Sequence, residues 1–265
     1  MTKQKVIFED LGIINYKSAW DYQELLVKEN LDIKKIIREQ NQDLSVPENA
    51  DGNSKNSSSL INVQPSTINH LLFCEHPPVY TLGKSGHMEN VLLSEQDMEE
   101  KEIEFFRTNR GGDITFHGLQ QVVGYPIIDL ENFYTDIGKY LRSLEEVIIL
   151  TIDEYGIKGA RSKGETGVWI ESGIAGKERK ICAMGIRCSR WITMHGFALN
   201  VNTDLSYFNN IIPCGIVNKQ VTSVEKELGY KVDYNELKEK IKRNFAKVFG
   251  VEFILLRALP HPAPA

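Results

Sequence analysis

The chain has 265 residues, of which 42% are hydrophobic and 25% charged, proportions typical of an ordinary folded protein and not of a fibrous or disordered one. Its 31 basic and 36 acidic side chains give a net charge of −5, and no basic stripe is present that would favour nucleic acid as a partner. No apolar run approaches the roughly 20 residues that span a bilayer, and MTKQKVIFEDLG at the N-terminus lacks the apolar region of a secretory signal. We therefore expect a cytoplasmic protein without a membrane partner, whose four cysteines are reduced thiols.

The first part of the chain predicts one long helix and then an irregular excursion. Apolar residues recur at helical spacing from residue 16 to residue 40. Residues 41–66 are crowded with Asn, Ser, Asp and Pro, and they bury too little apolar area to offset the entropy of ordering. We expect a flexible surface insertion at about 41–66, with a functional lid as the alternative.

The middle of the chain predicts short strands separated by turns. NHLLFCEH and VYTLGK predict two strands around the turn His76-Pro77-Pro78, and SEQDMEEK predicts a short helix. Further strands are expected in IEFFRTNR, ITFHG and VVGYPIIDL. Asp136 is expected to cap a helix that ends at Gly156.

The last part predicts mainly strands. TGVWIE, GIAG, KICAMGIRC and WITMHGFALNVN read as short strands, followed by a helix from about Tyr234 to Phe249 and a final strand, VEFILLRAL. Strands outnumber helices and often follow one another directly. The sequence thus predicts a single α+β domain over residues 1–265, with a mixed, largely antiparallel sheet flanked by helices.

The stretch RGGDITFHG, residues 110–118, combines a cation, two glycines, a strand-like run and a histidine. Gly111 and Gly112 contribute no side-chain burial, so they indicate a bend or a close approach to the backbone. Neither the GxxxxGK[ST] nor the GxGxxG phosphate-binding pattern occurs in the chain. Two interpretations stay open: Arg110 and exposed amides hold a polar head group, or the stretch is a β-bulge with a surface arginine.

The cysteines suggest covalent chemistry and not a metal site. Cys182, Cys188 and His195 lack the close CxxC or HxxxH pairs of zinc sites, and the two cysteines lie in apolar strands where a thiol is usually a small buried hydrophobe. We expect neither a metal nor another cofactor. Cys214 lies between a proline and a glycine, where a turn can present its side chain.

A nucleophilic Cys214 would need a base or cation that favours the thiolate. Lys180 is the candidate, because it opens the apolar strand KICAMGI. The local pattern favours a solvated lysine of the charged turn KERK, with an inward, desolvated lysine as the alternative.

RGGDITFHG, HPPVYTLG, KICAMGIR, HGFALNVN and IIPCGI together resemble the octanoyltransferases of lipoate biosynthesis, which are related to lipoate and biotin protein ligases. The resemblance begins at LGIINYKSAWDYQ and runs in order to the Cys214 loop. It implies the catalytic core shared with those ligases. It also implies transfer of octanoyl, without ATP, from the thioester of acyl carrier protein to a lysine of the lipoyl domains of 2-oxoacid dehydrogenases and of the glycine cleavage H protein.

Carried over by position, the resemblance makes Cys214 the acyl-thioester nucleophile and Lys180 the residue that lowers its pKa and acts as acid and base. It assigns substrate binding to three segments: Arg110, Gly111, Gly112, Asp113, Ile114, Thr115, Phe116 and His117; Ala183, Met184 and Gly185; Gly196, Phe197 and Ala198. His76 and His195 are accessory candidates. We expect the glycines to admit the acyl chain and amides of the second and third segments to stabilise the oxyanion. Ile114, Phe116 and Met184 are candidates to line the acyl tunnel, with a place in the core as the alternative for each.

One departure and several rivals accompany this interpretation. The family usually continues HGPGQ, whereas this chain reads His117-Gly118-Leu119-Gln120-Gln121, a change expected to alter the loop beside the site. An ATP-dependent lipoate or biotin ligase would not need Cys214. A binding module would never be acylated, and a cysteine hydrolase would pass the acyl group to water.

Overall fold

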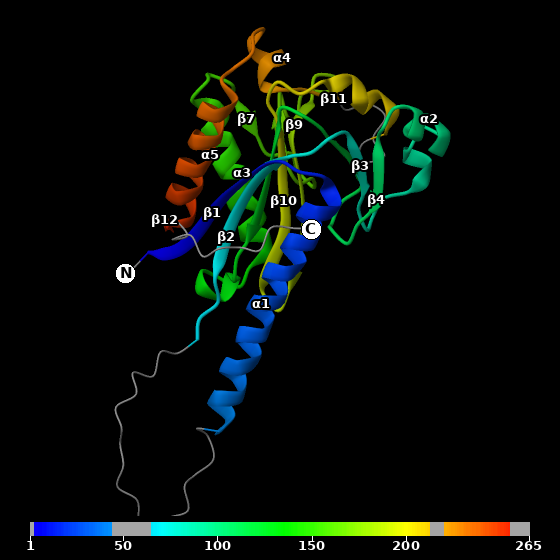
Figure 1. Cartoon of the computed structure of the whole chain (residues 1–265). Coiled ribbons are helices and arrows are strands. Elements are labelled where there is room, and N and C mark those ends of the chain that lie inside the picture. Colours follow the sequence, from blue (N-terminus) through cyan, green and yellow to red (C-terminus); the bar gives the residue numbers. More distant parts are fainter. Residues whose placement is uncertain (1–2, 44–64, 213–219, 255–265) are drawn as a thin grey trace, which may run out of the picture.

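The computed structural model describes residues 3–43, 65–212 and 220–254 (Figure 1). Within these residues, nine strands form one sheet in the order β12-β1-β2-β6-β10-β9-β8-β7, with β11 paired to β9. The strands are β1 (Gln4–Ile13), β2 (Asn69–Glu75), β6 (Gln121–Ile127), β7 (Gly159–Ala160), β8 (Val168–Ile170), β9 (Arg179–Ser189), β10 (Ile192–Asn200), β11 (Gln220–Val221) and β12 (Val251–Ile254). Three pairs are parallel, β1 with β12, β1 with β2 and β9 with β11, and the other pairs are antiparallel. The predicted α+β fold with a mixed, largely antiparallel sheet is confirmed.

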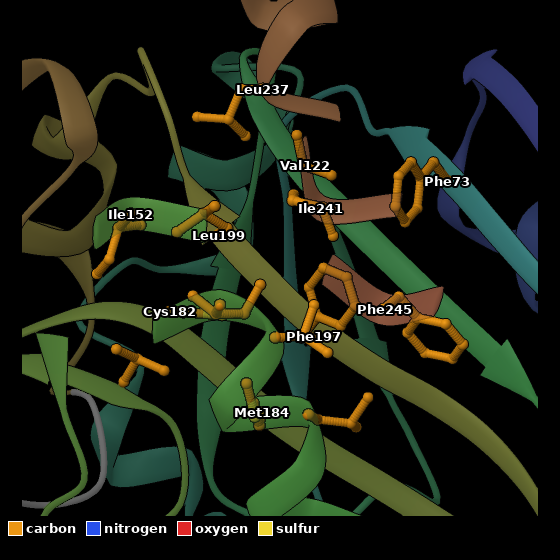
Figure 2. Packing of buried hydrophobic residues seen from close by; sticks show 14 of the residues in the cluster. Phe73, Val122, Ile152, Cys182, Met184, Phe197, Leu199, Leu237, Ile241 and Phe245 are labelled. Carbon is orange, nitrogen blue, oxygen red and sulfur yellow. The ribbon is translucent and has the colours of Figure 1, made fainter. Parts of the chain in front are cut away.

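Helices cover both faces of this sheet. Helices α3 (Ile137–Asp153) and α5 (Tyr234–Phe249) pack on one face, and α1 (Tyr16–Asp43) packs on the other (Figure 1). Alternation along the strands supplies the two cores: Phe197 of β10 joins the α3 and α5 side, whereas Ala198 joins the α1 side. Figure 2 shows the first core, where side chains of β2, β6 and β10 meet Ile241 and Phe245 of α5.

A second sheet of three strands lies beside the first. It contains β4 (Glu104–Arg107), β3 (Val79–Leu82) and β5 (Ile114–His117), in that order. Helix α2 (Glu95–Glu100) and the 3-10 turns η1 (Met88–Asn90) and η3 (Leu205–Asn210) accompany it, and η2 (Leu130–Asn132) follows β6. The small sheet has its own core, in which the Phe116 ring stacks on Tyr207 with centroids 4.6 Å apart. The loop before β5 joins the two sheets, because the Gly111 amide donates to the carbonyl of Ile186, 2.9 Å away.

Several predicted elements are confirmed. The first helix starts at Tyr16 and continues to Asp43, and the last covers Tyr234–Phe249. Asp136 caps α3 by accepting a hydrogen bond from the amide of Lys139, 2.8 Å away. The chain turns at Gly156, whose φ of +79° suits glycine.

Other elements differ from the prediction. GIAG, residues 173–176, forms turns because Gly173 and Gly176 adopt φ of +83° and +78°, which a strand does not. The strands on either side of His76-Pro77-Pro78 belong to different sheets and do not form a hairpin. No sequence pattern predicted β1, β7, β11 or α4 (Val224–Leu228). Most of the expected insertion at 41–66, and VEFILLRAL beyond Ile254, lie outside the described residues.

Among the described helices, none has both the length and the apolar character that crossing a bilayer requires.

Candidate active site

A cavity of about 90 Å³ lies on the α1 face of the large sheet, where the small sheet meets it. Tyr16 at the start of α1 lines one side. Gly196 and Ala198 of β10 contribute to the wall formed by the large sheet, and Ile114 and Thr115 of β5 to that formed by the small sheet. Segments far apart in the sequence are thus brought to one hollow.

The structure gathers most of the sequence-predicted site residues around this cavity. The lining includes Arg110, Gly112, Asp113, Ile114, Thr115, His117, Lys180, Ala183, Met184, Gly185, His195, Gly196, Phe197 and Ala198. Gly111, Phe116 and His76 do not line it. Phe116 instead belongs to the core of the small sheet, so of the two places open to it the core is the observed one. Cys214 lies outside the described residues.

Lys180 reaches the cavity because of a β-bulge. Val168 pairs with Cys182 and Trp169 with Lys180, so β9 carries one residue more than β8 between these pairs. In a regular strand Lys180 and Cys182 would share a face, yet Cys182 is fully buried in the core beneath α3 while Lys180 lines the cavity. Lys180 is half-buried, so it is not the fully solvated lysine of the KERK turn; it points inward as in the alternative, but it is not fully desolvated.

Arg110 is not a surface arginine. It is 7% exposed, and its Nη2 donates to the carbonyl and the Oγ1 of Thr81 in β3, at 2.5 and 2.9 Å. Its Nη1 donates to the carbonyl of Gly111, 3.1 Å away. The guanidinium therefore ties the RGG loop to the small sheet and places a positive charge beside the cavity.

The glycines of this region allow backbone to approach backbone. A Cβ on Gly185 would lie 2.5 Å from the carbonyl oxygen of Gly111, closer than real Cβ contacts come. A Cβ on Gly83 would overlap the carbonyl oxygen of Gly112. The close approaches thus pack the RGG loop on β9 and β3, while admission of an acyl chain by its glycines stays a prediction.

A run of buried hydrogen bonds connects the RGG loop to the strand that carries Lys180. His117 has one ring nitrogen 3.3 Å from Thr81 Oγ1 and the other 2.8 Å from Gln121 Oε1, an amide oxygen that accepts from Nδ1–H. The Gln121 amide nitrogen donates to Asn200 Oδ1 at 2.8 Å, and Asn200 donates to the carbonyl of Thr222 at 3.0 Å. The amide of Thr222 donates in turn to the carbonyl of Lys180, 3.0 Å away.

The histidines near the cavity are neutral at neutral pH. Burial lowers the pKa of His76 to about 4, although the Nδ1–H bond to the carbonyl of Ile14 opposes this. Burial, with help from Arg110 and Arg187, lowers the pKa of His195 to about 3. For His117, burial is again the main cause that holds the pKa well below its ordinary value.

His195 is the most unusual of the three. It occupies a strand with φ +57°, a region that non-glycine residues seldom adopt. Its amide donates to Gln23 Oε1 and its Nε2 lies 2.8 Å from Asn109 Oδ1, while Nδ1 has no hydrogen-bond partner among the described residues. The imidazole therefore presents an acceptor nitrogen within a buried environment.

Strand pairing limits which amides can face an oxyanion. Phe197 and Ala198 pair with β6 on one side and with β9 on the other, so their amides serve the two ladders. On β9, pairing with β8 ends at Cys182, which leaves one edge of residues 183–185 unpaired by a strand. This pairing does not support oxyanion donors at Phe197 and Ala198, and it leaves the β9 segment as the better candidate.

Sequence reasoning missed several lining residues. They are Tyr16, Gln121, Val123, Tyr125, Thr166, Asn200, Phe208 and Val221. Tyr16 and Asn200 lie within YKSAWDYQ and HGFALNVN, so membership in those motifs could have marked them. Thr166 opens the predicted strand TGVWIE, and its position there gave no such signal.

The described residues contain neither a group of metal ligands nor a thiol suited to nucleophilic attack. Among the described residues, no three His, Cys, Asp or Glu side chains gather as metal ligands would. Cys74 and Cys182 are buried and Cys188 is half-buried, and burial raises the pKa of all three thiols. None of these three is therefore suited to act as a thiolate.

Known proteins similar to this chain are octanoyltransferases and lipoate ligases. Residues 56–246 match the family model of the lipoyl protein ligase A/B catalytic domain. The octanoyltransferase of Flavobacterium johnsoniae is 53% identical over 252 residues, which cover 95% of this chain and 99% of that protein. The octanoyltransferase of Flavobacterium psychrophilum is 56% identical over 248 residues, 93% of this chain and 97% of that protein.

Solved structures share the fold at low identity. A lipoate-protein ligase A bound with ATP has a TM-score of 0.62 and 14% identity, covering 96% of this chain and 88% of that one. A bi-partite lipoate protein ligase from Thermoplasma acidophilum has a TM-score of 0.60 and 16% identity, covering 96% and 86%.

Proposed function

Because the chain belongs to the octanoyltransferases, whose catalytic domain is of the lipoyl protein ligase A/B type, we propose that Cys214 carries the octanoyl group as a thioester and that Lys180 moves the protons. The enzyme is an acyltransferase of protein lipoylation. The observation that carries the proposal is that Lys180 and the three motif segments line one cavity.

In the first half-reaction, Lys180 takes the thiol proton and the thiolate sulfur attacks the octanoyl carbonyl carbon. The carbon–sulfur bond of the donor thioester then breaks, and the ammonium of Lys180 returns the proton to the departing thiol. An amide on the edge of β9 that no strand pairs, within residues 183–185, stabilises the oxyanion, a contribution often worth about 3 kcal/mol per donor. Octanoyl is left on Cys214.

In the second half-reaction, the amine of an acceptor lysine attacks the acyl-enzyme. Lys180 accepts the proton that the amine loses, the new carbon–nitrogen bond forms, and the Cys214 thiolate leaves. A thioester is more activated than the amide product, so neither ATP nor a metal is needed. The apolar side chains of Ile114 and Met184 contact the acyl tail, with burial of each methylene worth about 0.8 kcal/mol.

The position of β11 supports a meeting of the two residues. This strand begins at Gln220, six residues after Cys214, and its Val221 pairs with Lys180. Six residues span at most about 20 Å when fully extended. A short stretch of chain thus separates Cys214 in the sequence from the strand that pairs with Lys180.

We propose octanoyl-acyl carrier protein as the donor. We further propose the lipoyl domains of 2-oxoacid dehydrogenases and the glycine cleavage H protein as acceptors, with the reaction in the cytoplasm. The names of the octanoyltransferase relatives support the acyl group, and the neighbour from Thermoplasma acidophilum is described as a bi-partite lipoate protein ligase and its E2 lipoyl domain. Transfer to an isolated lipoyl domain, followed by mass spectrometry of its lysine, tests the acceptor.

The test of the mechanism is an intact-mass measurement after mixing with octanoyl carrier protein, without ATP or acceptor. We expect one hydroxylamine-sensitive octanoyl group, absent from Cys214→Ala and formed much more slowly in Lys180→Ala. Cys188→Ala is the matched control and keeps the parent's acylation, because its thiol is half-buried and its pKa is raised. A parent that is never acylated, but that adenylates octanoate with ATP, would overturn the proposal in favour of a ligase.

A further inference from the structure

The cavity lysine has an aromatic ring behind it. The Nζ of Lys180 lies 4.5 Å from the centroid of a Trp169 ring. Trp169 is 2% exposed and does not line the cavity, whereas Lys180 does. The amine therefore lies with an aromatic face on one side and the cavity on the other.

Strand register fixes this arrangement. Trp169 pairs with Lys180 on β9 and with Ala160 on β7, so its backbone is held on both sides. Directly paired residues share a face of the sheet. The same bulge that turns Lys180 away from Cys182 brings it over the ring, because Val168 and Ile170 point to the opposite core.

The loop before Trp169 is also anchored. The buried carboxylate of Glu145 in α3 accepts a hydrogen bond from the amide of Gly167, 3.0 Å away. Gly167 adopts φ +108°, and a Cβ there would overlap the carbonyl oxygen of Cys182. Thr166, which lines the cavity, donates to the carbonyl of Met184 at 3.3 Å. The ring thus rests on a segment held to α3 and to β9.

We infer that Trp169 is a positioning residue for Lys180, an inference that rests on the proposed role of Lys180 in proton transfer. An ammonium is attracted to the face of an indole, more strongly where water is excluded. The ring therefore holds the amine toward the cavity and stabilises the protonated form, the one that must return a proton to the leaving thiol. It touches neither donor nor acceptor.

Other charges near this site are already engaged. Arg110 and Asp113 line the same cavity from the small sheet's side, and Asp113 accepts from Asn90. Glu145 pairs with Arg142 and Arg161. From β9 and α4, Arg179 and Glu227 form an ion pair, and the Cys182 thiol next to Lys180 has its pKa raised by burial. These groups remain in every variant below, so differences between variants report on the ring.

The experiment measures the rate of thioester formation on Cys214 against pH in the full chain. Loss of the ring makes it easier for the ammonium to lose its proton. The alkaline limb of the profile, where the rate falls as the pH rises, should therefore move to lower pH. We expect a downward shift of about one pH unit and about a tenfold slower reaction in Trp169→Met, from a cation–π contact whose strength lies between the exposed and the desolvated limits because Lys180 is half-buried. Trp169→Phe, which keeps an aromatic face, should restore most of the rate and of the limb.

Ile170→Ala is the control for packing, since it removes a core side chain from the same strand on the opposite face. It should lower the melting temperature without moving the alkaline limb. Fluorotryptophan placed at position 169 weakens the attraction of the ring face without changing its shape, and should shift the limb by an intermediate amount even if Trp169→Met does not fold.

The inference would be overturned if the alkaline limb of Trp169→Met, of Trp169→Phe and of the fluorotryptophan protein all matched that of the parent. It would also be overturned if Ile170→Ala moved the limb as far as Trp169→Met does. Either result leaves the proposed function standing. A parent enzyme that forms no thioester on Cys214 would instead refute the proposed function, and the inference with it.

Discussion

The contact between the RGG loop and β9 makes Gly185→Ala the most direct test of how the cavity is built. The new Cβ would lie 2.5 Å from the carbonyl oxygen of Gly111 and 3.3 Å from Arg110 Nη1. The loop must therefore move, which weakens the hydrogen bond from the Gly111 amide to Ile186. Overpacking of about 1 to 3 kcal/mol and loss of one hydrogen bond of about 1 kcal/mol predict a destabilisation of about 2 to 4 kcal/mol.

The assay combines thermal unfolding with the rate of octanoyl transfer to a lipoyl domain. For a chain of this size the destabilisation corresponds to a fall in Tm of about 5 to 10 °C. The rate should fall by at least about tenfold, because Gly185 and the displaced Arg110 both line the cavity.

Gly111→Ala is the matched control from the other side of the same contact. A Cβ there would meet only the carbonyl oxygen of Ile186, at 3.4 Å, an ordinary contact distance. We expect its stability to stay within about 1 kcal/mol of the parent. If Gly185→Ala matched Gly111→Ala in both Tm and rate, the close packing of the loop on β9 would be refuted.

Two further predictions concern buried polar groups. Burial lowers the pKa of His76 to about 4. Between about pH 6.5 and 4 the unfolded chain therefore binds a proton that the folded chain does not. The free energy of unfolding should fall as the pH drops through this window, by up to about 3 kcal/mol. Urea unfolding at about pH 7.5 and pH 5 should show a smaller fall for His76→Gln, and an equal fall would contradict the assignment. Gln121→Leu removes the link between His117 and Asn200 and should cost about 1 to 3 kcal/mol with slower octanoyl transfer. The exposed Gln96→Leu should change the Tm and the transfer rate little, and equal losses in both variants would argue against the buried network.

The sequence predicted the architecture well where local signals and long-range packing agree. Helix α5 has polar residues on one side. Asp233 caps its start and Gly250 follows its last residue, so the sequence predicts both of its ends. GIAG was misread because its apolar residues resemble a strand, while the conformation of its two glycines depends on the turn that joins β8 to β9. Strand β11 has two residues, too few for any pattern to show.

The orientation of Lys180 shows why the site was harder to predict than the fold. Alternation along KICAMG would place Lys180 with Cys182, and only pairing with β8 introduces the bulge that separates them. Arg110 presents the same difficulty, because its burial arises from Thr81, about thirty residues earlier in the chain. The resemblance to a known family grouped Lys180 and Arg110 in one site, because it compares motifs and does not depend on the contacts that bury these side chains.

The departure at Leu119 and Gln120 illustrates how such a motif can change without losing its geometry. Gln120 adopts φ +60°, a conformation that glycine takes more easily and that the HGPGQ pattern would fill with glycine. Its carbonyl accepts hydrogen bonds from Val201, Asn202 and Thr203, and its amide donates to Glu75 at 2.6 Å. These bonds offset the strain of the left-handed backbone, so the next residue, Gln121, still reaches His117.

The shared fold does not by itself decide between adenylation and direct transfer, since a ligase bound with ATP has the same architecture at 14% identity. The chemistry of the donor explains how one scaffold can serve both. A free acid must first be activated, whereas a thioester already carries an activated carbonyl and needs only a nucleophile and a proton carrier. Strand β10 is paired on both sides at Phe197 and Ala198, so this wall of the cavity is held in place by two neighbouring strands. In the proposed mechanism, direct transfer relies on a lysine turned into the cavity by one bulge and on a cysteine that precedes β11 in the sequence.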